Sequence, residues 1–286
     1  MVDNEDGIEK PVMHACGHDV HITTLLAAAE TLFKARVKWS GTLICLFQPA
    51  EEKGTGAMDM IKDDVYGKIG HTPDIVLGAH VSPYPAGFVG IRPGPITANA
   101  NGFKITVYGL GGHASQPDAT VDPVVLASHI VVRLQTIVSR EVSPADMVVL
   151  TVGSIESGEA ENIISDQAII RVNIRSYKKD VRDRVLASLK RIVDAECMAS
   201  GTPKPALFES TCDLPLTPND MDCTVQLSAS FNEVFGHGFN DNVDRIAGSE
   251  DFSILATEIG RPCCFWIYGQ ESRSDFNVAS LTNMSQ

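Results

Sequence analysis

The chain has 286 residues, of which 44% are hydrophobic and 21% charged, and its formal net charge is −13. This length allows a sizeable core and predicts two domains rather than one. The acidic balance argues against nucleic-acid and anionic-membrane partners, because both rely on clustered Lys and Arg. No apolar run reaches the roughly 20 residues of a membrane helix, and the acidic start lacks a signal peptide's basic region. We therefore expect a cytoplasmic protein.

The first part of the chain, to about residue 95, alternates predicted helices with continuously apolar strands. The spacing of apolar residues predicts helices over 20–36 and 57–65, and strands over 42–47 and 74–79. Alternation of this kind favours a mostly parallel sheet, whose ligands collect beyond the carboxyl ends of the strands. That rule places Glu51, Glu52 and His80 together, because they follow the two strands.

From about residue 96 the strands alternate apolar and polar residues, as strands with one solvated face do. The predicted order is β-α-β-β-α-β, typical of a ferredoxin-like unit, over residues 103–108, 123–138, 147–155, 167–177, 180–198 and 205–209. The earlier pattern then returns, with a helix over 223–235, a helix capped by Ser249–Phe252, and a buried strand over 262–268. We therefore expect an α/β fold with one discontinuous domain (1–95 and 211–286) and an inserted α+β domain (96–210).

One group of side chains carries metal-binding chemistry. Cys16 and His18 are two residues apart in a glycine-containing turn, and Glu51-Glu52 and His80 follow predicted strands. Thiolate, imidazole and carboxylate bind zinc-like ions, and a second carboxylate beside the ligand can take a proton from bound water. Taken alone, Glu51-Glu52 fits a solvated acidic turn better than a metal site. Together with Cys16, His18 and His80, the pair predicts one metal site.

Other candidate residues have simpler interpretations. The seven cysteines are an odd number without a regular spacing, so we expect mostly free thiols, with Cys263-Cys264 in the core. His14 and His21 could each lie at a helix end or behind a ligand, and they are left out of the ligand set. Residues 109–114 superficially match a dinucleotide-binding loop, but Pro117 and Pro123 interrupt the helix that should follow. We therefore expect no nucleotide cofactor.

Six segments jointly resemble the M20 metallopeptidase family, in its amidohydrolase branch of hippurate hydrolase, N-acyl-amino-acid deacylases and auxin-conjugate hydrolases. The matching segments are 13–19 (MHACGHD), 47–52 (FQPAEE), 78–80 (GAH), 111–115 (GGHAS), 162–164 (NII) and 248–252 (GSEDF). They occur in order along nearly the whole chain. The resemblance implies a metal-dependent hydrolase that cleaves the amide bond of N-acyl amino acids or small dipeptide-like substrates.

The resemblance also implies a role for individual residues. Cys16, His18, Glu52 and His80 match ligands of two divalent metal ions, which could be zinc, manganese or cobalt, and Glu51 matches the general base. His113 and Asn162 match residues of the inserted lid that bind the substrate or polarise its carbonyl, His113 often from the other subunit of a homodimer. Arg175 is a weaker match to a residue that holds the substrate carboxylate.

Two departures from the family pattern leave an alternative open. The family carries a longer segment before the Cys-Gly-His motif, so we expect a chain that is incomplete at its N-terminus. The family also places a histidine ligand after its last strand, whereas residues 268–276 contain none. One metal ion or none could therefore bind. The alternative function is a catalytically impaired family member that acts as a dimeric binding or interaction protein.

Overall fold

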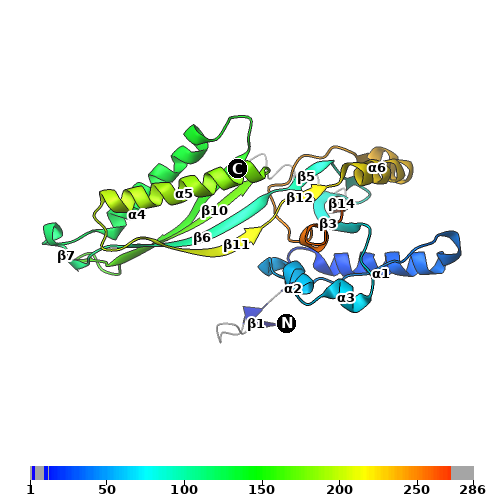
Figure 1. The fold of residues 1–286 in the computed structure, drawn as a ribbon, viewed down its shortest axis with the longest axis horizontal. Coiled ribbons are helices and arrows are strands. Elements are labelled where there is room, and N and C mark those ends of the chain that lie inside the picture. The colour runs from blue at the N-terminus through cyan, green and yellow to red at the C-terminus, as the bar shows by residue number, and fades with distance from the viewer. Residues whose placement is uncertain (1, 4–9, 12, 272–286) are drawn as a thin grey trace.

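The computed structural model describes residues 2–3, 10–11 and 13–271, and its elements form two groups along the long axis of the molecule (Figure 1). Residues 99–214 form the first group, which we call the insert. Residues 13–98 and 215–271 form the second, which we call the base. Before the base, β1 (Val2–Asp3) pairs with β2 (Lys10–Pro11).

The insert is a four-stranded antiparallel sheet with two helices on one face (Figure 1). Its main elements are β6 (Asn99–Tyr108), α4 (Pro123–Thr136), β8 (Val148–Glu156), β10 (Gln167–Ser176), α5 (Lys179–Ala199) and β11 (Leu207–Leu214). The strand order is β11-β6-β10-β8. This connectivity confirms the predicted ferredoxin-like unit.

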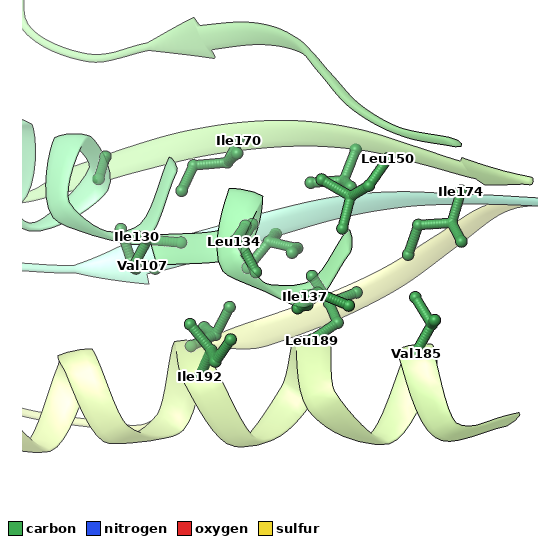
Figure 2. Close-up of a cluster of buried hydrophobic side chains, with 14 of the residues drawn as sticks. Val107, Ile130, Leu134, Ile137, Leu150, Ile170, Ile174, Val185, Leu189 and Ile192 are labelled. Atoms are coloured by element: carbon green, nitrogen blue, oxygen red, sulfur yellow. The ribbon is translucent and has the colours of Figure 1, made fainter. Parts of the chain in front are cut away.

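The core of the insert lies between the sheet and the two helices. Alternate residues of β10 point toward the helices, and Ile170 and Ile174 are fully buried there. Leu134 of α4 and Leu189 of α5 meet them from the opposite side (Figure 2). Each such side chain contributes about 1.5–3 kcal/mol on removal from water. The insert therefore has a hydrophobic core of its own.

Short elements complete the end of the insert that lies farthest from α1 (Figure 1). β7 (Gly112–His113) pairs with β9 (Ile163–Ile164), and a 3₁₀ turn covers Pro117–Ala119. After residue 114 this turn comes first, and α4 begins only at Pro123. At the other end of α4, a π turn covers Ile137–Glu141.

The base contains a mixed sheet of order β13-β4-β14-β3. Its strands are β3 (Val76–Pro85), β4 (Val89–Gly90), β13 (Phe239–Asn240) and β14 (Cys263–Glu271). β3 runs parallel to β14, and β13 runs parallel to β4, whereas β14 and β4 are antiparallel. Cys263 and Cys264 are buried as predicted. The fold is therefore α/β with a mostly parallel sheet in the base.

Helices of the base surround this sheet. They are α1 (His18–Lys34), α2 (Gly56–Lys62), α3 (Val65–Ile69), α6 (Met221–Phe235) and α7 (Ile254–Thr257), with 3₁₀ turns at Arg36–Lys38, Glu51–Lys53 and Gly236–Gly238. Among residues 13–271, no helix is both long and apolar enough to cross a membrane.

Two antiparallel strands, β5 (Gly94–Thr97) and β12 (Thr217–Asn219), lie where the chain enters and leaves the insert. The hydroxyl of Thr97 donates to that of Thr217 over 2.8 Å. The Asn219 side chain donates to the carbonyls of Arg92 and Phe265, and its oxygen accepts from Phe265 N. These buried bonds hold the two connections side by side.

The structure corrects three predictions in the base. Residues 42–47 form no strand, and Leu43 and Phe47 are 44% and 50% exposed, because no strand of the described chain pairs with them. The predicted helix 57–65 breaks at Asp64, whose φ of 56° is left-handed. His80 lies inside β3 rather than at its end, because pairing with β14 continues to Pro85.

Candidate metal centre

Three segments bring the predicted ligands together: the start of α1, the 3₁₀ turn at Glu51–Lys53, and β3. Cys16 and His18 flank Gly17, whose φ is +72°. A Cβ at Gly17 would lie 2.4 Å from Cγ2 of Val81, so only glycine allows the turn to approach β3 this closely. The turn thereby brings Cys16 and His18 to His80.

The donor atoms form two overlapping groups. Cys16, His18 and His80 form one, and His18, Glu51 and Glu52 form the other, with donor atoms in each group within 4.8 Å of one another. Cys16 Sγ lies 3.5 Å from His80 Nε2. His18 Nε2 lies 3.5 Å from Glu51 Oε2 and 3.7 Å from Glu52 Oε1. The predicted site residues of the base are thus all in one place.

The His80 ring is held in an orientation that suits a ligand. Its Nδ1 lies 2.5 Å from the carbonyl of Val81, which leaves Nε2 facing Cys16. The amide of Val81 donates in turn to Nε2 of His21 over 3.0 Å, and the two imidazole centroids are 4.4 Å apart. Burial and the neighbouring histidines lower the pKa of His21 to about 4. His21 is therefore a neutral support behind His80.

Glu250 is an additional carboxyl group in the cluster. Its side chain is 15% exposed, and Oε1 lies 3.9 Å from His80 Nε2. It also hydrogen-bonds to Glu51. Burial, followed by the negative charge of Glu51, raises the pKa of Glu250, and burial also raises the pKa of Glu51. The two carboxyl groups therefore share a proton when no cation balances their charge.

These residues fit a divalent cation of the zinc type. Sulfur, imidazole nitrogen and carboxylate oxygen donors lie within 4.8 Å of one another in each group, and Nε2 of His80 faces the Cys16 sulfur. Burial and the nearby carboxylates Glu52 and Glu51 raise the pKa of Cys16. A cation would reverse that shift, because metal binding needs the thiolate. The mixed donor set suits zinc, manganese and cobalt.

The predicted residues of the insert are divided between its two ends. Arg175, at the end of β10 near the base, donates to the carbonyl of Ala247 over 2.6 Å and to Ser249 Oγ over 3.2 Å. His113 lies at the far end, in β7 (Figure 1), with its Nδ1 2.8 Å from Ser115 Oγ. Asn162 is also there, and its carbonyl accepts from Ala114 N. The structure brings neither His113 nor Asn162 to the metal cluster of the same chain.

Sequence reasoning missed the roles of Glu250 and Asp251, whereas it had left open that His21 lies behind a ligand, as it does. We expected Ser249–Phe252 to cap the following helix, but the carboxylate of Asp251 accepts from Gln48 Nε2 and Ala57 N instead. Those donors are distant in sequence, so local capping rules could not predict the contact. The available signal was the acidic pair Glu250-Asp251 within a segment that carried the family resemblance.

The α/β base with its thiol, imidazole and carboxylate cluster, joined to a ferredoxin-like insert, has the fold of a metal-binding peptidase. The model of peptidase family M20/M25/M40 matches residues 2–280, and the chain belongs to this family.

Curated relatives carry several hydrolase names. The chain is 35% identical over 257 residues to thermostable carboxypeptidase 2 of Saccharolobus solfataricus, covering 85% of this chain and 61% of the relative. It is 42% identical over 177 residues to N-acetyl-L-cysteine deacetylase of Bacillus subtilis, covering 62% and 42%. It is 35% identical over 272 residues to the Arabidopsis thaliana protein IAA-amino acid hydrolase ILR1-like 2, covering 94% and 60%. The chain thus spans about three fifths or less of these relatives.

Solved structures agree with this assignment. A putative aminohydrolase from methicillin-resistant Staphylococcus aureus matches with a TM-score of 0.80 and 33% identity, over 92% of this chain and 66% of that one. The Bacillus subtilis YXEP protein, described as a dinuclear metal binding peptidase from the M20 family, matches with a TM-score of 0.70 and 26% identity, over 94% and 70%.

Proposed function

We propose that this protein is a metal-dependent amidohydrolase that cleaves the amide bond of N-acyl amino acids or small dipeptide-like substrates. The observation that carries the proposal is the pair of overlapping donor groups, in which Glu51 and Glu52 face His18 while Cys16 faces His80. The names of the N-acetyl-L-cysteine deacetylase and the auxin-conjugate hydrolase support the substrate class. Cys16, His18, Glu52 and His80 are the proposed ligands.

Divalent ions held by these residues would lower the pKa of water and polarise the substrate carbonyl. Glu51 is the proposed general base. Its side chain is 21% exposed, and burial raises its pKa toward the range in which a carboxylate both takes and returns a proton. Glu51 would accept a proton from the attacking water and then donate it to the leaving nitrogen. Arg175 would hold the substrate carboxylate at the adjoining end of the insert.

His113 and Asn162 fit this proposal if they act on the site of a second subunit. Both lie at the end of the insert that points away from the cluster of their own chain (Figure 1). A homodimer formed through the insert would bring His113 to the partner's substrate, where it would stabilise the developing oxyanion. Gel filtration combined with light scattering measures this assembly directly.

The remaining parts of the proposal concern domains, metal and location. We propose a metal-binding domain of residues 1–95 and 211–286 and a lid and dimerisation domain of residues 96–210. The metal is zinc, manganese or cobalt, which elemental analysis of the purified protein identifies. All seven cysteines lie in the described part of the chain and are free, which supports a reducing, cytoplasmic location.

The test of the proposed chemistry is Glu51→Gln. The change keeps the size of the side chain but removes its basicity, so we expect bound metal to remain and turnover of N-acyl amino acids to fall at least about 100-fold. Glu233→Gln, on the exposed face of α6, is the matched control and should retain full turnover. Unchanged turnover in Glu51→Gln would refute the mechanism. A wild-type dimer without metal or turnover would favour the binding protein instead.

A further inference from the structure

The loop from Gln48 to Ala57 carries the proposed base and ligand in a demanding backbone conformation. Ala50 has a φ of +50°, which a residue with a side chain rarely adopts. Gly54 has a φ of +64°. Inside the loop, Lys53 N donates to Ala50 O over 3.2 Å, Gly54 N donates to Glu51 O over 2.7 Å, and Thr55 N donates to Ala50 O over 3.5 Å. These three bonds lie within residues 50–55, so the two ends of the loop are held by contacts from outside it.

Asp251 supplies that support at both ends of the loop. Its side chain is fully buried at 0% exposure. Oδ1 accepts from Gln48 Nε2 over 2.5 Å, and Oδ2 accepts from Ala57 N over 3.0 Å. The two donors are the first and last residues of the loop. One carboxylate thus fixes the distance between the loop ends.

A carboxylate is well suited to this position. Ala57 N lies in the first turn of α2, where backbone amides have no partner inside the helix, and Thr55 at the N-cap makes no side-chain bond to it. Hydrogen bonds to a charged acceptor are about twice as strong as neutral ones. The neighbouring Glu250 enters the metal cluster, whereas Asp251 contacts the back of the loop. Glu250 therefore contacts the candidate ligands, and Asp251 contacts the loop backbone that carries Glu51 and Glu52.

We propose that Asp251 and Gln48 form a positioning pair that sets the place of the Glu51 and Glu52 carboxylates. The pair touches neither substrate nor metal ion and acts through the loop backbone. This inference rests on the proposed function for the roles of Glu51 and Glu52, but the contacts themselves do not depend on it.

An exchange of chemical groups tests the pair. In Asp251→Asn a neutral amide replaces the charged acceptor. The bonds to Gln48 and Ala57 N are therefore weakened, even where the Gln48 amide turns over to accept from the new NH₂ group. In Gln48→Glu two carboxylates face each other. When both changes are combined, the new amide at position 251 can donate to the new carboxylate at position 48 and still accept from Ala57 N, while the net charge equals that of the wild type. We therefore expect both single variants to be impaired and the double variant to recover.

The first measurement is hydrogen exchange of the metal-free protein. Loss of a buried bond to a charged acceptor should accelerate exchange of the Ala57 amide about tenfold or more in Asp251→Asn and Gln48→Glu. The double variant should return to within about twofold of the wild type. Asp241→Asn, an exposed acid of the same segment, is the control and should leave exchange unchanged.

The second measurement separates positioning from general stability. At a temperature where every variant is folded by circular dichroism, the single variants should lose about tenfold in Zn²⁺ affinity and in kcat, with KM within about twofold. The double variant should recover both values. If Asp251→Asn does not fold, Gln48→Glu and the double variant still provide the comparison.

Unchanged exchange of Ala57 in the single variants overturns the inference. So does a double variant that is no better than the worse single variant, because the pair then has no specific coupling. If the wild type lacks turnover while exchange and Zn²⁺ affinity follow the expected order, the proposed activity fails and the positioning pair stands.

Discussion

The neutral state of His21 predicts how the stability of the metal-free base depends on pH. The pKa falls from the ordinary 6.5 to about 4, mainly because the ring is buried and secondarily because His80 and His18 are near. Without solvent screening, this difference in pKa between the folded and unfolded chain would change the free energy of unfolding by about 3 kcal/mol. Because part of the ring remains in contact with water, we expect about 1–2 kcal/mol.

The sign follows from proton binding. The unfolded chain takes up a proton near pH 6.5, whereas folded His21 stays neutral down to about pH 4. The contribution of neutral His21 to the free energy of unfolding is therefore fully present above about pH 7.5 and is lost as the pH falls from 6.5 to 4. His21→Gln does not titrate, and its side-chain oxygen can still accept from Val81 N. The stability of this variant should therefore not include the part of the pH dependence that comes from His21.

Urea unfolding in the presence of a chelator measures the effect. Both tryptophans, Trp39 and Trp266, lie in the base, so their fluorescence follows its unfolding rather than that of the insert. Between pH 7.5 and 4.5 the wild type should lose about 1–2 kcal/mol more stability than His21→Gln. Identical pH dependence in the two proteins would show that His21 is not held neutral by the fold.

Two further changes have expected results. Leu189→Ala removes a side chain that is 2% exposed between α5 and the sheet, and it should lower the free energy of unfolding by about 2–5 kcal/mol. Leu26→Ala, at a side chain 56% exposed on α1, should lower it by less than about 0.5 kcal/mol. Thermal unfolding followed by circular dichroism measures both, and equal losses would contradict the burial pattern. Gly17→Ala should weaken Zn²⁺ binding about tenfold or more, because its Cβ would lie 2.4 Å from Val81 and push the Cys16 turn away from His80. Gly260 also has a positive φ, but a Cβ built there has no atom within 4 Å, so Gly260→Ala is the control for backbone strain alone. Calorimetric titration measures the Zn²⁺ affinity, and equal affinities of the two variants would refute this reasoning.

The sequence predicted elements most accurately where local pattern and tertiary burial agree. In the insert, alternation in β10 and helical spacing in α5 match the observed elements closely, because both pack on one shared core. In the base, the apolar residues 42–47 have the pattern of a buried strand but no pairing strand in the described chain, so Leu43 and Phe47 stay exposed. The apolar pattern shows which side chains a segment could bury, but burial also requires a neighbouring strand that pairs with it.

The candidate site was predictable as far as residue type carries chemistry. Cys16, His18, Glu51, Glu52 and His80 were identifiable because thiol, imidazole and carboxylate groups followed predicted turns and strands. Glu250 was not identified, because its contact with His80 joins residues far apart in the chain. For His21 the sequence left two positions open, at a helix end or behind a ligand, and the contact with Val81 decides between them. Asp251 was assigned to a local cap because its true partners are distant along the chain.

The separation between Gln48 and Asp251 also bears on how the protein is made. The two residues are 203 positions apart. At a ribosomal rate of about 5–20 residues per second, residue 251 follows residue 48 by about 10–40 seconds. The core of the insert lies within residues 99–214 and can form before then. On the proposed role of Asp251, the loop with Glu51 and Glu52 is held in place only after this interval, and the candidate metal centre would be completed after the insert has emerged.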